Sequence, residues 1–92
     1  MIRVQNNSNL ENGIKTISLE LKNIPKKPGV YKMINFNNDI LYIGKAKNLY
    51  NRVLYYTQPN RLNKRLITMI SNVYRIEINI TNSEVEALLL ES

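Results

Sequence analysis

The feature that most restricts the fold of this chain is a pair of short strand-forming segments separated by a polar turn. Residues 29–34 (GVYKMI) and 40–43 (ILYI) are rich in β-branched and aromatic side chains, and residues 35–39 (NFNND) between them favour a turn. Two such segments joined by about five polar residues predict a β-hairpin. Pro25 and Pro28 precede the hairpin and end any helix that approaches it.

Two tyrosines belong to this predicted hairpin, one on each strand. A register that pairs Met33 with Ile40 would place Tyr31 opposite Tyr42, with both phenols on the same face of the sheet. Aromatic residues in this arrangement also pack across strands without any catalytic role. The hairpin alone therefore leaves both interpretations open, cross-strand packing and a functional tyrosine pair.

The remaining segments predict a small α+β domain. Residues 1–13 are polar and rich in Asn, and we interpret them as an arm outside a single domain that spans residues 14–92. The spacing of apolar residues, an Asn cap and a capping box predict helices over about 14–22, 48–56 and 61–72, and a last helix that begins at Ser83. These helices would flank a small, central, largely antiparallel sheet of three strands.

The third strand is predicted by strict alternation over residues 74–80 (YRIEINI). Ile76, Ile78 and Ile80 alternate with polar residues, so their side of the strand is expected to be buried. Gly44 is expected to end the second strand of the hairpin.

Positive charge is concentrated in the middle of the chain. The 92 residues include 13 Lys and Arg against 7 Asp and Glu, a formal net charge of +6. Residues 45–65 hold six basic side chains and no acidic one, so the charge of this segment equals the net charge of the whole chain. Clustered cations with nearby tyrosines are typical of nucleic-acid contacts, although a solvated basic surface has the same composition. The candidate DNA-binding residues are Lys47, Lys64 and Arg65, and the other cations of the segment are Lys45, Arg52 and Arg61.

The composition excludes several classes of protein. The chain has no Cys, which excludes disulfides, thiolate metal sites and a cysteine nucleophile. It also has no His, the commonest general base and metal ligand. No apolar stretch approaches the ~20 residues that span a bilayer, and residues 1–10 lack the apolar core of a secretory signal. A cytoplasmic location is the resulting expectation.

Three glutamates lie in the last predicted helix, and one of them has no clear structural role. Glu84 and Glu86 fall in the first turn, where the helix dipole and a capping box account for them. Glu91 lies near the other end, where a carboxylate is electrostatically unfavourable. One carboxylate with several waters forms an ordinary Mg²⁺ site, whereas a solvated glutamate is the simpler interpretation. With Arg52 for phosphate charge and a Tyr or Lys as proton acceptor, metal-assisted phosphodiester cleavage could be assembled from these parts.

Four segments of the sequence resemble the signature of GIY-YIG nucleases. They are residues 28–31 (PGVY), 41–49 (LYIGKAKNL), 51–53 (NRV) and 81–91 (TNSEVEALLLE). Their order and spacing are similar to one branch, the N-terminal domains of the UvrC family, which incise DNA in bacterial nucleotide excision repair. The likeness runs from about residue 21 to the end of the chain. The second and fourth segments argue against other branches, such as homing or structure-specific nucleases.

This resemblance implies a fold, an activity and partners. The fold is an α+β domain with a small central antiparallel sheet. The activity is hydrolysis of one DNA strand on the 3′ side of a lesion, with one divalent ion, Mg²⁺ or Mn²⁺. In a full-length protein, the partners besides DNA would be UvrB and, through the repair complex, UvrA.

The resemblance also implies roles for individual side chains. The implied active site contains Tyr31 as the water activator, Tyr42 and Tyr56 as supporting tyrosines, Lys45 as a contact to phosphate or water, Arg52 as the stabiliser of the transition state, and Glu91 as the single metal ligand.

The chain departs from the family pattern at two places. Tyr50 stands where many relatives have Arg, and the longer helix and Asn-containing tail that follow the glutamate in the family are absent after Ser92. From the sequence we therefore expect a C-terminally truncated domain, either a fragment or a shortened gene product. The alternative function is a DNA-binding or repair-assembly remnant that nicks DNA poorly or not at all.

Overall fold

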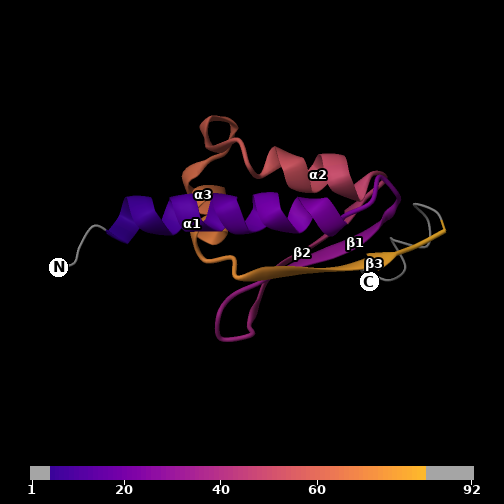
Figure 1. Ribbon diagram of the computed structural model, residues 1–92, viewed down its shortest axis with the longest axis horizontal. Coiled ribbons are helices and arrows are strands. Elements are labelled where there is room, and N and C mark those ends of the chain that lie inside the picture. The colour runs from indigo at the N-terminus through magenta and orange to yellow at the C-terminus, as the bar shows by residue number, and fades with distance from the viewer. Residues whose placement is uncertain (1–4, 83–92) are drawn as a thin grey trace.

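Residues 5–82, the part of the chain that the computed structural model describes, fold as three α-helices packed on one antiparallel sheet (Figure 1). The elements are α1 (Gln5–Glu20), the 3₁₀ turn η1 (Leu21–Asn23), β1 (Gly29–Ile34), β2 (Ile40–Ala46), α2 (Leu49–Tyr55), the 3₁₀ turn η2 (Pro59–Arg61), α3 (Lys64–Ser71) and β3 (Arg75–Ile80). The strand order is β2-β1-β3, and both strand pairs are antiparallel. The predicted α+β class with a three-stranded sheet is confirmed.

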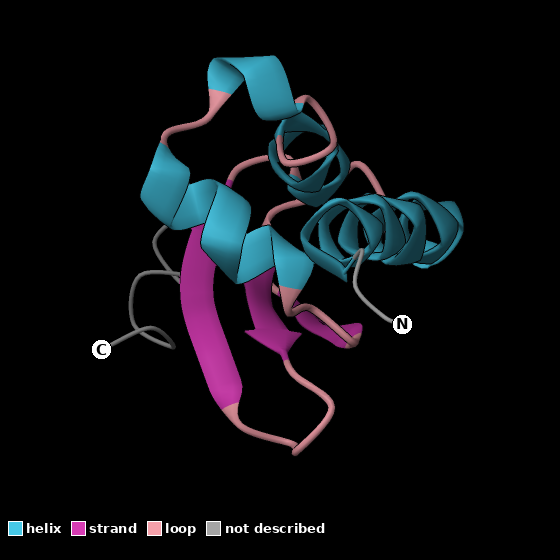
Figure 2. Cartoon of the chain, turned by 90° about the vertical axis from the view of Figure 1, so that its left-hand side faces the viewer, coloured by secondary structure: helices cyan, strands magenta, loops and turns pink. Residues whose placement is uncertain are grey.

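The three helices cover one face of the sheet, and the core lies between the two layers (Figure 2). The central strand β1 contributes Tyr31 and Met33 to this core, and β3 contributes Ile76. The helices contribute side chains that are 0% exposed, namely Ile17, Leu49, Val53 and Ile70. Burying an aliphatic side chain of this size stabilises a fold by about 1.5–3 kcal/mol. No helix within residues 5–82 is long and apolar enough to cross a membrane.

The first helix is longer than the sequence predicts. The expected helix covers 14–22, whereas α1 begins at Gln5, so much of the predicted arm is helical. The cause is contact with a distant part of the chain. Gly13 approaches α3 so closely that a Cβ at this position would lie 2.0 Å from the carbonyl oxygen of Ile70, and Leu10 packs against the core. Tertiary packing of this kind outweighs the weak helix propensity of an Asn-rich segment.

The hairpin forms as predicted, but its register differs. Tyr31 pairs with Gly44 and Met33 pairs with Tyr42, so the predicted pairing of Met33 with Ile40 is wrong by two residues. Because side chains alternate with a period of two, this shift leaves both tyrosines on the same face, as expected. The face assignment is thus confirmed, while the two tyrosines are diagonal neighbours rather than direct partners.

A tight turn and a β-bulge set this register. The amide of Asn35 donates to the carbonyl of Asp39 at 3.0 Å, and the amide of Asp39 donates to Asn35 Oδ1 at 2.8 Å. Asn38 takes a positive φ of 72°, a conformation that Asn tolerates better than most residues. The bulge that follows leaves Leu41 as an extra, unpaired residue of β2.

The third strand confirms the predicted alternation only in part. Ile76 is buried and Ile78 is half-buried, but Ile80 is 54% exposed. Ile80 pairs with Gly29, which has no side chain to pack against it. The buried face of β3 is therefore confined to the part of the strand that the helices cover.

Candidate active site

Three tyrosines from different parts of the chain form one group, here called the tyrosine cluster: Tyr31 of β1, Tyr42 of β2 and Tyr56 at the end of α2. The hydroxyls of Tyr31 and Tyr56 lie 2.9 Å apart, within hydrogen-bond distance. The ring centroid of Tyr31 lies 5.9 Å from that of Tyr42 and 6.1 Å from that of Tyr56. Because Tyr31 is 1% exposed, Tyr56 4% and Tyr42 40%, the cluster reaches the surface mainly through Tyr42.

Gly44 provides the space for the buried ring of Tyr31. The two residues are cross-strand partners, and a Cβ on Gly44 would lie 2.5 Å from both Cζ and the hydroxyl oxygen of Tyr31. The prediction that Gly44 ends the strand is wrong, because β2 continues through it to Ala46. Glycine inside a strand often marks such a close approach. Gly44 of the segment 41–49 and Tyr31 of the segment 28–31 thus form a single structural unit.

Burial keeps the two inner phenols of the cluster uncharged. It raises the pKa of Tyr31 far above the ordinary value of 10.0, and the hydrogen bond with Tyr56 raises this pKa further. Burial also raises the pKa of Tyr56, although there the same hydrogen bond acts in the opposite direction. The Arg52 guanidinium lowers the pKa of both phenols but does not cancel the effect of burial. At neutral pH both hydroxyls therefore keep their protons and act as hydrogen-bonding groups.

A pocket of about 460 Å³, here called the basic pocket, adjoins the cluster where β2 leads into α2. Its walls are Lys45, Ala46, Lys47, Asn48, Asn51, Arg52 and Tyr55. The ring of Tyr55 packs edge-on against Tyr56 with the centroids 5.6 Å apart, which connects the pocket to the cluster. Three of these described lining residues are cations and none is a carboxylate, so the pocket favours phosphate.

The start of α2 positions the cations of this pocket. Asn48 is the N-cap, as predicted, and its Oδ1 accepts a hydrogen bond from the backbone amide three residues later at 3.0 Å. The helix then carries Arg52 and, four residues on, Tyr56, so both side chains lie on one face. The Leu49 amide donates to the carbonyl of Lys27 at 2.9 Å, which ties the start of α2 to the segment before β1.

The structure brings together five of the six residues to which the resemblance gives catalytic roles. Tyr31, Tyr42 and Tyr56 form the cluster, and Lys45 and Arg52 line the basic pocket. The sixth residue, the predicted metal ligand Glu91, lies outside the residues that the structure describes.

The three candidate DNA contacts are divided between two places. Lys47 lines the basic pocket, whereas Lys64 and Arg65 lie at the beginning of α3, which starts later than the predicted helix of 61–72. Asn51 and Tyr55 also line the basic pocket. The sequence placed Tyr55 among the tyrosines near the cations and Asn51 in a motif segment, but named neither as a site residue. Their position one residue before and three residues after Arg52 on a predicted helix is the signal that could have found them.

No metal site is complete within the described residues. Over this part of the chain no group of three or more His, Cys, Asp or Glu side chains could hold an ion. The described carboxylates belong to α1, to the hairpin turn and to β3, and none of them lines the basic pocket. Within residues 5–82 no carboxylate lines the basic pocket, and the predicted metal ligand Glu91 lies outside this range.

Sequence comparison relates the chain to the C proteins of UvrABC systems. Residues 27–92 match the family model of the UvrC-like GIY-YIG domain. The chain is 49% identical over 80 residues to UvrABC system protein C of Rhodospirillum rubrum, and 51% identical over 72 residues to that of Methylobacillus flagellatus. These matches cover 87% and 78% of this chain, but in both cases only 12% of the relative.

Structural comparison agrees with the sequence. The GIY-YIG N-terminal endonuclease domain of UvrC from Thermotoga maritima, bound to magnesium as its catalytic divalent cation, matches with a TM-score of 0.73 and 32% sequence identity. The match covers 82% of this chain and 81% of that domain. Together with the motif segments and the fold, these matches show that the chain belongs to the family of UvrC-like GIY-YIG domains.

Proposed function

We propose that this chain is the nuclease domain of a UvrC-type protein and hydrolyses one DNA strand on the 3′ side of a lesion during nucleotide excision repair. The observation that carries the proposal is the junction of the basic pocket with the tyrosine cluster, where cations that attract phosphate adjoin hydroxyls that can orient water. The relatives support it, because they are components of the UvrABC system and the matched structure is an endonuclease domain.

The basic pocket holds the phosphate that is cut. Arg52 offers a planar set of N–H donors that suits phosphate oxygens, and its charge opposes the negative charge that develops in the transition state. Lys45 contacts the phosphate or the attacking water, and Lys47 attracts a neighbouring phosphate. The effect of Arg52 on the pKa of both Tyr31 and Tyr56 supports a guanidinium located between the pocket and the cluster.

The tyrosine cluster orients the attacking water. Because burial raises the pKa of Tyr31, its hydroxyl stays protonated, and we assign its role in activating water to hydrogen bonding rather than to direct proton removal. Tyr56 fixes this hydroxyl through the 2.9 Å contact, and Tyr42 supports the Tyr31 ring. A single Mg²⁺ or Mn²⁺ ion on Glu91 would lower the pKa of a bound water, so that its proton could pass to solvent, and would stabilise the departing oxygen.

The other steps of repair belong to a larger protein. Because the chain spans 12% of the length of the two named relatives, we assign the contacts with UvrB, and with UvrA through the repair complex, to the full-length protein. Within this chain, we assign the nuclease domain to residues 14–92 together with the preceding residues of α1, because Leu10 and Gly13 pack against the rest of the fold. The proposed location is the cytoplasm.

The test is nicking of supercoiled plasmid DNA that carries ultraviolet lesions, in the presence of Mg²⁺, Mn²⁺ or EDTA. We expect nicked circles with either ion and none in EDTA. Glu91→Ala should slow nicking by at least about 100-fold, the scale of losing one group that stabilises transition-state charge. Glu11→Ala, which removes an exposed carboxylate of α1, is the matched control and should nick at the wild-type rate.

Three outcomes would count against the proposal. Nicking by Glu91→Ala at the wild-type rate would contradict the metal assignment. Equal nicking in EDTA would contradict the need for an ion. Salt-sensitive DNA binding without nicking, under every metal condition, would favour the alternative function of a DNA-binding remnant.

A further inference from the structure

A second pocket adjoins the tyrosine cluster at the other end of β2. It lies between the beginning of β2 and α3, and its volume is about 320 Å³. Its lining residues are Leu41, Tyr42, Asn63, Arg65, Leu66 and Met69, and we call it the β2–α3 pocket. None of the catalytic roles proposed for this chain uses it, although Tyr42 belongs to both the pocket and the cluster.

The β-bulge of the hairpin builds this pocket. Successive side chains of a regular strand point to opposite faces, so two neighbours such as Leu41 and Tyr42 do not normally line one cavity. Here Leu41 is the extra residue of the bulge, and it packs against the core on the same side as the contact between Tyr42 and Tyr31. Bulges that redirect a side chain are common beside active sites.

The β2–α3 pocket combines an apolar surface with an exposed aromatic ring. Leu41, Leu66 and Met69 are half-buried, and the phenol of Tyr42 is 40% exposed. This surface suits the flat face of a nucleobase, because bases stack on aromatic side chains with little dependence on sequence.

Hydrogen-bond donors lie on the rim of the same pocket. Asn63 caps α3, and its Oδ1 accepts a hydrogen bond from the Leu66 amide at 2.9 Å, which leaves its NH₂ group as a donor. Arg65 is exposed and has no hydrogen bond or ion pair within the described part of the chain. Because no carboxylate is among the described lining residues, the rim favours phosphate oxygens and base carbonyls.

The two pockets lie along the same edge of the sheet. β2 is an edge strand, and on one of its faces it contributes Tyr42 to one pocket and Ala46 to the other. These residues are four positions apart, about 13 Å at the usual rise of a strand. Since successive base pairs of duplex DNA are separated by about 3.4 Å along the axis, a strand that follows this edge reaches the β2–α3 pocket within a few nucleotides.

We propose that the β2–α3 pocket receives one unstacked nucleotide of the strand that is cut, with its base against Tyr42 and Leu66 and a phosphate on Arg65. This inference rests on the proposed function, because it takes the basic pocket as the site of the scissile phosphate. A base enters such a pocket only after it leaves the duplex stack, and the cost is smallest where the base is already unpaired. The domain therefore binds DNA with unpaired bases near the cut more tightly than fully paired DNA.

The test compares two duplexes of equal length in EDTA, one fully paired and one with a short unpaired bubble that contains 2-aminopurine. We expect the wild-type chain to bind the bubble about tenfold more tightly, and to quench 2-aminopurine fluorescence as the base stacks on Tyr42. Met69→Glu, which puts a carboxylate into the pocket, should abolish both effects. Arg61→Ala removes a cation of the same basic segment that does not line the pocket, and it should preserve both.

A second variant guards against loss of folding in Met69→Glu. Arg65→Ala alters an exposed residue, so its fold is expected to persist, as checked by circular dichroism. It should weaken binding to the bubble several-fold more than binding to the paired duplex. Equal weakening for both DNAs, or equal wild-type affinity for both, would overturn the inference.

The design separates this inference from the proposed function. A chain that nicks plasmid DNA but shows no preference for the bubble would overturn the nucleotide pocket alone. A chain that prefers the bubble but does not nick with either ion would support the pocket as a binding site and contradict the proposed nuclease.

Discussion

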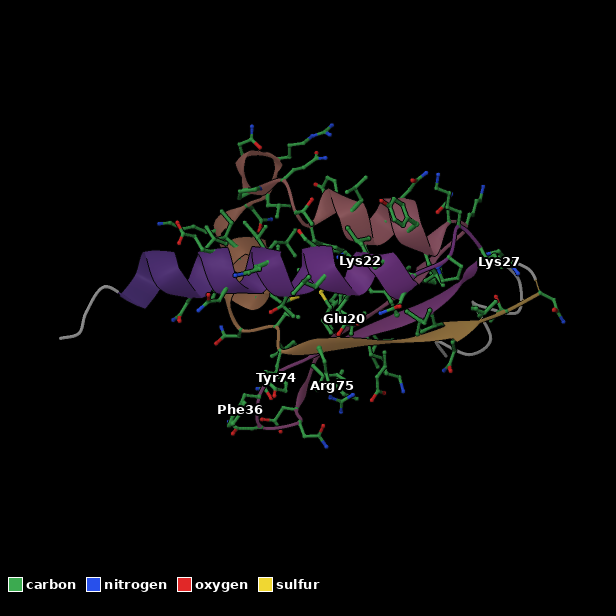
Figure 3. All side chains as sticks on the ribbon, viewed as in Figure 1. Glu20, Lys22, Lys27, Phe36, Tyr74 and Arg75 are labelled. Carbon is green, nitrogen blue, oxygen red and sulfur yellow. The ribbon has the colours of Figure 1, made fainter. Side chains whose placement is uncertain are left out.

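The two ends of the hairpin carry similar residue types in different electrostatic surroundings. At one end, the tyrosine cluster is largely buried, and Arg52 has no carboxylate partner among the residues that the structure describes. At the turn end, Phe36 and Tyr74 pack edge to face with their centroids 5.2 Å apart and remain 77% and 56% exposed (Figure 3). Arg75 lies beside this second aromatic pair, where it forms an ion pair with Glu77.

This difference shows that aromatic and arginine content alone does not locate a phosphate site. The arginine at the turn end is paired with its neighbour on β3, whereas Arg52 has no carboxylate partner within residues 5–82. An arginine that is not already paired with a carboxylate attracts a polyanion more strongly. The aromatic groups differ as well, because burial holds the Tyr31 hydroxyl in one position and the ring of Phe36 has no hydroxyl to offer.

The largest expected effect separates the two arginines. Arg52→Ala should lower the rate of plasmid nicking by about 100- to 1,000-fold, because the proposed role of this guanidinium is to oppose the charge that develops on the phosphate. Arg75→Ala, the matched change at the turn end, should leave the rate within about twofold of the wild type, as for most surface substitutions. Single-turnover nicking at saturating DNA measures both. Equal losses in the two variants would show that the ends do not differ in function.

The next effect tests the geometry of the cluster. Gly44→Ala places a methyl group 2.5 Å from two atoms of Tyr31, so we expect the free energy of unfolding to fall by about 1–3 kcal/mol and nicking to fall with it. At the turn end, Asn38→Gly replaces a residue of positive φ by one that accepts it freely, and should change stability by less than about 0.5 kcal/mol. Urea denaturation measures both. A Gly44→Ala protein of wild-type stability would contradict the close contact with Tyr31.

Local patterns in the sequence predicted most elements of this fold. The hairpin, the strand β3 and the helix α2 with its cap Asn48 all follow from signals within a few residues. The errors arose where distant parts of the chain meet. α1 extends to Gln5 because Gly13 contacts α3, and the hairpin register depends on a turn and a bulge that residue composition does not encode.

The sequence predicted which residues form the candidate site, but not how deeply each of them is buried. The motif tyrosines and the cations after Gly44 were identified from sequence, and the structure brings them together. No local pattern states that Tyr31 is buried while Tyr42 is exposed, because this follows from the register and from the missing side chain of Gly44. The β2–α3 pocket was not predicted either, since it depends on the extra residue Leu41.

A smaller effect is expected from the buried hydroxyls at alkaline pH. The pKa of Tyr31 is raised in the folded state, so its phenol stays protonated in the folded chain at a pH where it ionises in the unfolded chain. The free energy of unfolding is therefore unaffected by this group below its ordinary pKa of 10.0, and falls as the pH rises above that value. At one pH unit above this value, Tyr31 should cost about 1.4 kcal/mol of unfolding free energy. In Tyr31→Phe the part of the loss that is due to Tyr31 should be absent, and only the part due to Tyr56, whose pKa burial also raises, should remain. Tyr74→Phe at the exposed turn end should retain both parts. Urea midpoints between pH 8 and about 11 measure the difference.

The smallest expected effect addresses charge compensation at the turn end. Arg75 lowers the pKa of Glu77. The ion pair therefore stabilises the folded state above the ordinary glutamate pKa of 4.5, and this stabilisation is lost as the pH falls through the lowered pKa. Because the pair is exposed, Glu77→Gln should leave the urea midpoint at pH 7 nearly unchanged. The substitution also frees one cation, so the salt dependence of DNA binding should steepen by about one unit in the log–log slope. An unchanged slope would mean that compensation by Glu77 is not what distinguishes Arg75 from Arg52.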